Sequence, residues 1–291
     1  MDMDWLAEPF RHPFVRRALV AAVLIGFTNG YASAFVVLKR SALKVGSLSH
    51  ALLPGLAVAV LVGGLSDWSA FLGALVAALF VGLGSLAVAR GSRLDHDSAL
   101  AILHTAAFSG GIILLRRLGV SRQLDDWLFG NIMNLKDGDL WMNYTISLLA
   151  LGLLTALHRP LLMTLFEPEV AATLGVPVRA LNYLLLTVLI VVLISSLQAV
   201  GCMLALGLLV TPAATLYLLT DSTSRLFWGA AVLGAAAAAL AVLAGWWLNL
   251  EQGPAIVLVL GGCFALAFLF GPKYGLLRRW LRPGESEAPQ G

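Results

Sequence analysis

Charge is scarce in this sequence. Only 12% of its 291 residues are charged, whereas 59% are hydrophobic. A soluble globular domain has about 25% charged residues. The charges that are present gather in short polar stretches between long apolar runs, and the small net charge of +3 needs no nucleic-acid partner. The composition therefore predicts an all-α membrane protein with several crossings, because lipid accepts an apolar surface and water does not.

Cysteine pairs and catalytic motifs are also missing. Cys202 and Cys263 lie separately in apolar runs, which predicts neither a disulfide framework nor a structural zinc site. The chain has no phosphate-binding loop of the G-x-x-x-x-G-K-[ST] type, so ATP hydrolysis would require a separate chain. It also has no H-E-x-x-H or G-x-S-x-G motif and no paired carboxylates within its apolar runs. We therefore expect neither enzymatic activity nor a bound cofactor in this chain.

About nine segments are long and apolar enough to cross a bilayer or come close to it. A helix needs roughly 20 residues to cross, because each residue rises about 1.5 Å. The stretch Ala180–Thr220 is too long for one crossing and is divided near Gly201, and Pro54 predicts a broken or tilted second segment. The segments are Phe14–Leu38, Ser47–Val62, Trp68–Ala89, Ser98–Leu115, Leu140–Leu157, Ala180–Val200, Cys202–Thr220, Leu226–Leu248 and Pro254–Phe270.

Lys and Arg are distributed unequally between the two sides of these segments. An excess of both residues marks cytoplasmic loops. The richer side holds Lys39, Arg40, Lys44, Arg90, Arg93, Arg159, Arg179, Arg225, Lys273, Arg278, Arg279 and Arg282. This pattern predicts a cytoplasmic C-terminus and an external N-terminus. If the first segment is instead partly an interfacial helix, the N-terminus changes sides.

Two histidines are candidate metal ligands. His50 lies near the start of the second segment, one turn before Pro54, and His104 lies in the middle of the fourth. Neutral imidazole binds zinc, manganese and iron, and a histidine at membrane depth usually faces a cavity or a partner. A packed or hydrogen-bonded histidine is the competing interpretation at both positions.

A short polar stretch between His158 and Arg179 predicts a helix outside the membrane. Glu167 suits a helix start, Pro168 the first helical position, and Gly175 the helix end. By the charge distribution this helix lies on the cytoplasmic side. Its mixture of apolar and acidic residues is typical of a docking helix, although an interfacial helix fits the same pattern.

Several stretches, in this order and at this spacing, resemble one family. They are Phe35–Arg40, Leu48–Gly55, Phe166–Pro177, Gln198–Gly201, Leu208–Thr215 and Asn249–Pro254. The chain resembles the metal-transport permeases of ABC importers, the zinc and manganese (ABC-3) family, from about Phe14 to Arg279. This resemblance implies a type II ABC importer permease fold in the bacterial inner membrane.

The resemblance also implies a function and partners. Such permeases transport zinc or manganese, with chelated iron as a further candidate, and receive the metal from an extracytoplasmic binding protein. They work as homodimers, and two ABC ATPase subunits dock on their coupling helices. His50 matches the family's pathway histidine. The residues that match the coupling helix are Glu167, Pro168, Glu169, Ala171, Leu174 and Gly175.

One position departs from the family pattern. Gly46 stands where the family has an aspartate, four residues before His50. This loss keeps open a permease-like scaffold without transport. An ATPase-independent secondary transporter or channel is the other alternative, although the middles of the apolar segments lack the Asp, Glu or Arg that such proteins often carry. The expected organisation is an N-terminal segment (1–13), a transmembrane permease domain (14–271) with its coupling helix at about 167–175, and a basic cytoplasmic tail (272–291).

Overall fold

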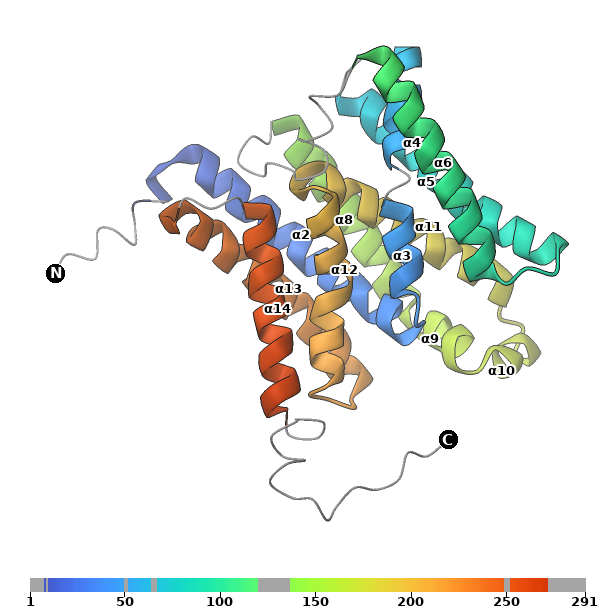
Figure 1. The fold of residues 1–291 in the computed structure, drawn as a ribbon. Helices are drawn as coiled ribbons and strands as arrows, with labels where there is room; N and C mark the ends of the chain where they lie inside the picture. The colour runs from blue at the N-terminus through green and yellow to red at the C-terminus, as the bar shows by residue number, and fades with distance from the viewer. Residues whose placement is uncertain are drawn as a thin grey trace.

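The computed structural model describes residue 8 and residues 10–49, 52–63, 67–119, 137–248 and 252–271. The described part of the chain is helical, with short turns and no strand (Figure 1). Its helices are α2 (Pro13–Leu38), α3 (Ala42–Ser49), α4 (Leu52–Gly63), α5 (Asp67–Gly91), α6 (His96–Leu118), α8 (Asp137–Ala156), α9 (His158–Phe166), α10 (Pro168–Thr173), α11 (Val178–Val200), α12 (Cys202–Tyr217), α13 (Thr223–Leu248) and α14 (Gln252–Phe270). The all-α class predicted from the sequence is therefore confirmed.

Six of these helices are long and apolar enough to cross a membrane, namely α2, α5, α6, α11, α13 and α14. A seventh crossing results if α8 and α9 count as one span, although the chain bends by 64° between them. The other two predicted segments correspond to shorter apolar helices, within α4 and α12. The described residues therefore confirm six of the expected crossings by length and composition.

The predicted division of the long apolar stretch near Gly201 is confirmed. The chain breaks at Gly201, whose φ of 83° and ψ of 166° are accessible to glycine and strained for other residues. This glycine separates α11 from α12. In the second segment, α3 covers Ala42–Ser49 and α4 covers Leu52–Gly63 with Pro54 near its start; residues 50 and 51 lie outside the described part, so the expected break stays a prediction.

Close glycine packing joins α2 to α13 in the main bundle. Gly26 lies against the backbone of Gly234, and Gly30 lies against the backbone of Ala230. A Cβ atom added to Gly26 or Gly30 would overlap the facing carbonyl oxygen. Small residues permit this approach, which is a common way for helices to associate in lipid.

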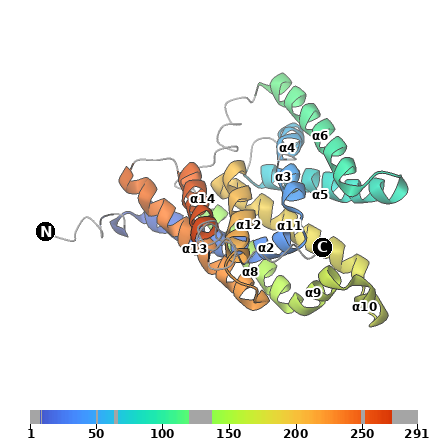
Figure 2. The same cartoon turned by 60° about the horizontal axis from the view of Figure 1, so that its bottom comes forward.

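Helices α4, α5 and α6 form a second group to one side of the main bundle in both views (Figures 1 and 2). Gly55 of α4 packs on Gly73 of α5. Gly111 of α6 packs on Pro54 of α4, so all three helices meet at small residues or at the proline ring. This packing fixes the helix that follows the candidate metal ligand His50.

Polar side chains in the main bundle hydrogen-bond between helices. The Asn29 amide of α2 donates to the Ser196 hydroxyl of α11 at 2.6 Å. The Ser195 hydroxyl donates to Asn143 Oδ1 of α8 at 2.6 Å. These buried pairs satisfy polar groups away from water and connect three helices. Many large apolar side chains instead face outward, including Phe80 and Leu258, which suits contact with lipid.

Candidate functional site

The α9–α10 elbow forms the part of the molecule that the sequence predicted as a docking helix. After α8 the chain turns by 64° into α9, continues through α10, and enters α11. Figure 1 shows α9 and α10 at one end of the helix bundle, at the lower right of the view. The short helix therefore lies outside the bundle, connected directly to the base of α11.

The ends of α10 follow the sequence signals closely. Pro168 occupies the first turn, and Glu167 holds the N-cap position without a side-chain capping bond. At the other end Gly175 has a φ of 79°. The Gly175 N–H donates to the Ala172 carbonyl at 3.1 Å, and the Val176 N–H donates to the Ala171 carbonyl at 2.9 Å. These two bonds form a Schellman motif, which ends α10 and redirects the chain toward α11.

Three apolar side chains form an exposed stripe on this elbow. Phe166, Val170 and Leu174 are 60%, 46% and 65% exposed. Val170 and Leu174, four residues apart, lie on one face of α10, and Phe166 is the last residue of α9, just before the interruption at Glu167. Ala171 is buried and anchors the helix, whereas Glu167 and Glu169 are exposed beside the stripe. We call Phe166, Val170 and Leu174 the elbow stripe. Its composition, large apolar groups beside acidic ones, is typical of a protein-docking surface.

The base of α11 is tied to both helix groups. Lys39, just after α2, donates from Nζ to Asn182 Oδ1 at 2.9 Å. The next residue of α11, Tyr183, stacks under the Arg90 guanidinium of α5 at 4.5 Å and accepts a hydrogen bond from it. The elbow continues into this base of α11, so a displacement of α10 would act on both helix groups through it.

The same end of the molecule carries the basic side chains of the sequence analysis. Burial, together with the positive charge of Lys44, lowers the pKa of Lys39 from its usual value. Lys44 of α3 pairs with Asp97 of α6 at 3.0 Å. The Ser85 hydroxyl of α5 hydrogen-bonds with the His96 ring of α6 at 3.0 Å. These contacts hold α3, α5 and α6 together on the basic face.

The predicted metal ligands are not brought together in the part of the chain that the structure describes. His50 lies outside the described residues. His104 is half-buried in α6, with its ring 6.0 Å from the ring of Phe108. The described residues contain no group of three or more His, Cys, Asp or Glu side chains that could hold a metal ion. Gly46, in α3, has open space around the position of an added Cβ atom.

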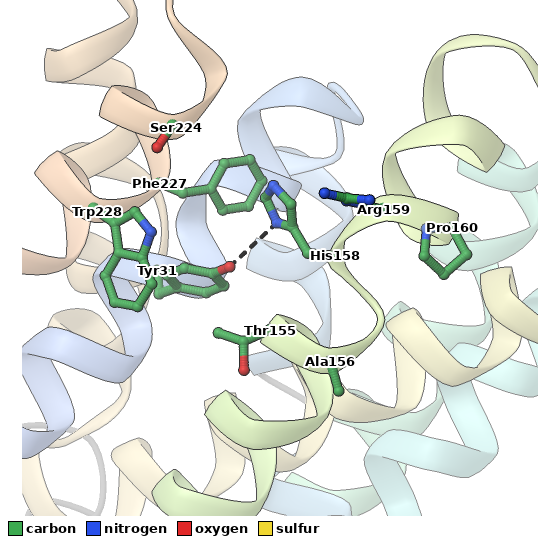
Figure 3. Close-up of a pocket in the computed structure, with 9 residues that line it drawn as sticks. All are labelled: Tyr31, Thr155, Ala156, His158, Arg159, Pro160, Ser224, Phe227 and Trp228. Carbon is green, nitrogen blue, oxygen red and sulfur yellow. Dashed lines mark hydrogen bonds between the residues drawn. The ribbon is translucent and has the colours of Figure 1, made fainter.

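A pocket that the sequence analysis missed lies beside the elbow. The cavity is about 440 Å³, and Figure 3 shows the residues that line it. The Tyr31 hydroxyl of α2 hydrogen-bonds with His158 Nδ1 at 3.2 Å. The Phe227 ring packs against both, with centroids 5.1 Å from Tyr31 and 4.6 Å from His158. The available signal was weak, namely aromatic residues such as Trp228 near the ends of apolar segments, where they are common in membrane proteins.

Comparison with known proteins decides the family. The profile of the ABC 3 transport family matches residues 11–271. The chain belongs to the ABC 3 transport family. The family assignment made from the sequence motifs is thus confirmed, and the chain is a multi-pass membrane protein and a transport subunit.

Relatives within the ABC 3 transport family align with nearly the whole chain. The manganese transport system membrane protein MntC of Halalkalibacterium halodurans is 37% identical, over 93% of this chain and 92% of its own. The chelated iron transport system membrane protein YfeD of Yersinia pestis is 28% identical, over 93% of this chain and 90% of its own. A solved structure, PsaBC from Streptococcus pneumoniae in complex with Fab, has a TM-score of 0.83 and 30% identity, and the match covers 96% of this chain and 99% of that chain.

Proposed function

We propose that this chain is the membrane-spanning permease subunit of an ATP-binding cassette importer for manganese. The support is membership of the ABC 3 transport family, together with 37% identity to a manganese transport protein over 93% of the chain. Zinc and chelated iron are the other cargoes compatible with the family. The metal is the transported substrate, so the chain needs no resident cofactor.

One observation carries the energy-coupling part of the proposal, which is the elbow stripe. Val170 and Leu174 expose large apolar side chains beside Glu167 and Glu169, on the basic face of the molecule. We assign this surface to a separate ABC ATPase subunit. Because α10 leads directly into α11, movement of a docked ATPase would displace the start of α11, where Asn182 bonds to Lys39 just after the end of α2. ATP binding and hydrolysis would then shift the permease between two states of access.

The remaining organisation follows the same proposal. Residues 14–271 form the transport domain with nine crossings, in which α4 and α12 are short spans. Two copies pair around a central path, and an extracytoplasmic metal-binding protein delivers the ion. His50 is the candidate pathway ligand, and His104 is a second candidate on α6. The tail, 272–291, lies outside the described residues and is assigned to the cytoplasmic side.

Metal accumulation in cells tests the cargo directly. Deleting the gene should lower the cellular manganese content measured by mass spectrometry under manganese limitation, and a plasmid copy should restore it. A loss of zinc or iron with unchanged manganese would change the cargo assignment. Manganese uptake that persists when the associated ATPase is inactivated would instead favour an ATPase-independent transporter.

A further inference from the structure

The cavity beside the elbow is chemically different from the docking surface. Its walls come from α2, the junction between α8 and α9, and the first turns of α13. Tyr31, Phe227 and Trp228 supply aromatic surface, and Arg159 supplies a positive charge. In Figure 3 the Phe227 ring of α13 lies against His158, and Trp228 lies beside Tyr31. The transport proposal uses none of these groups.

The electrostatics of this cavity favour an anion. Helix α13 begins at its wall and carries no acidic residue in its first turn, whereas the N-terminus of α9 adjoins the C-terminus of α8, whose partial charge is opposite. The N-terminus of a helix carries a partial positive charge and N–H groups that lack partners within the helix. Arg159 adds a full positive charge, and the Ser224 hydroxyl adds a hydrogen-bond donor at the same cavity, whereas the Thr155 hydroxyl already donates to the Leu151 carbonyl at 2.7 Å. This combination suits a phosphate group.

The depth of the cavity matches the headgroup layer of a bilayer. Trp228 lies five residues after Thr223, the start of α13, which corresponds to about 8 Å along the helix. Tryptophan and tyrosine gather at this level of a membrane. Trp228 is 49% exposed, so part of its indole remains open beside the cavity.

An apolar surface continues from the cavity toward the middle of the membrane. Trp228 contacts Phe27 of α2, with ring centroids 6.2 Å apart. One turn deeper on each helix lie the exposed side chains Val232 and Val23. An acyl chain could follow this apolar surface while its headgroup occupied the cavity. Because an apolar surface adjoins the phosphate-binding cavity, the site suits a phospholipid better than a free phosphate ion.

We propose that this cavity binds the phosphate headgroup of an anionic phospholipid from the leaflet on the basic face. Arg159 and the N-terminus of α13 bind the phosphate, Ser224 hydrogen-bonds to it, and Trp228 packs against the glycerol region. The bound lipid then fills the angle between α8 and α9. Lipid in this position would stabilise the elbow in the orientation seen here.

Native mass spectrometry of the purified chain tests the proposal. The probes are phosphatidylglycerol and phosphatidylcholine at equal concentration. We expect the unaltered chain to retain phosphatidylglycerol in preference to phosphatidylcholine. The affinity for phosphatidylglycerol should fall about tenfold in Arg159→Gln, because a charge-assisted contact is lost, and should also fall in Ser224→Ala. Arg179→Gln, which removes an exposed arginine from the same basic face outside the cavity, is the matched control and should retain the lipid like the unaltered chain.

Three results would overturn the assignment. The unaltered chain could retain no phosphatidylglycerol in preference to phosphatidylcholine, or Arg159→Gln could retain as much as Arg179→Gln. Displacement of the lipid by an equal concentration of glycerol phosphate would identify a soluble phosphate as the occupant. The measurement uses neither metal nor ATPase, so its failure would leave the transport proposal standing.

Discussion

Gly46 is the position at which the sequence differs from the family motif that its neighbouring residues resemble. It lies in α3, four residues before His50, and an added Cβ atom there would meet no other atom within 4 Å. The position therefore has room for the carboxylate that the family pattern places there. A carboxylate oxygen is a ligand that manganese favours. The absence of an acid at this position predicts weak retention of the ion on the transport path.

Replacing this glycine should strengthen metal binding. We expect Gly46→Asp to lower the manganese concentration for half-maximal binding roughly tenfold or more, since changes around a metal site commonly alter affinity on that scale. Isothermal titration of the purified chain measures the effect. Gly91→Asp adds the same charge at another open glycine and serves as the control. Equal affinities for the two variants would show that residue 46 does not face the metal path.

Lys39, which bonds to the base of α11, should make the stability of the folded chain depend on pH. Burial and the nearby Lys44 lower its pKa below the usual value of 10.5, so its charged form is less favourable in the folded chain than in the unfolded chain. Below the folded pKa this penalty is fully present. As the pH rises through the folded pKa toward 10.5, the lysine loses its proton in the folded state and the penalty disappears.

The neutral variant Lys39→Gln should therefore have a higher Tm than the parent chain near pH 7, and this advantage should shrink toward pH 10. Glutamine can still donate a hydrogen bond to Asn182. Thermal unfolding in detergent at several pH values measures the difference in Tm. Arg179→Gln, at an exposed position near the start of α11, should show no such pH-dependent difference. A difference independent of pH at residue 39 would contradict the assigned cause.

The contact between α2 and α13 depends on the absence of side chains. A methyl group at residue 30 would overlap the Ala230 backbone. Gly30→Ala should destabilise the chain by about 1–3 kcal/mol, the usual cost of overpacking, and lower its Tm. Gly152→Ala, at a glycine in α8 with open space around it, should leave the Tm unchanged or slightly raised. Equal Tm values for the two variants would contradict the close packing of α2 on α13.

At the scale of the element, the exposed apolar side chains of α10 are predicted to bind the ATPase. Charges at Val170 and Leu174 should prevent apolar docking without disturbing the fold, because both side chains are exposed. We expect the double variant Val170→Asp with Leu174→Asp to lose at least tenfold in affinity for the proposed ATPase partner, measured with purified proteins. Ala172→Asp adds a charge to the same helix at an exposed position outside the stripe. The Ala172→Asp variant should bind the ATPase more tightly than the double variant does.

At the scale of the whole molecule, local sequence signals predicted the features that depend on local conformation. The break at Gly201 and the boundaries of α10 at Pro168 and Gly175 follow from backbone preferences of glycine and proline. The apolar runs likewise predicted the long crossings. Family resemblance, in turn, identified the transport class through motifs spread along the chain.

Features that depend on tertiary packing were not predictable in this way. The 64° bend between α8 and α9 has a local marker that the sequence prediction did not use, because Pro160 cannot donate a hydrogen bond to the Ala156 carbonyl four residues earlier. The facing of Gly30 and Ala230, and the meeting of Tyr31 with His158, join residues far apart in the chain. Hydropathy gives the length of a segment but not its neighbours, so the cavity beside the elbow emerged only from the fold.

ATP-driven uptake in proteoliposomes tests the central claim most directly. The chain would be reconstituted with its ATPase and its binding protein, and radioactive manganese inside the vesicles would be measured with and without ATP. The account predicts uptake that requires ATP and falls to background in the double variant at Val170 and Leu174, while Ala172→Asp retains it. Manganese uptake that is equal without ATP, or unaffected by the double variant, would contradict it.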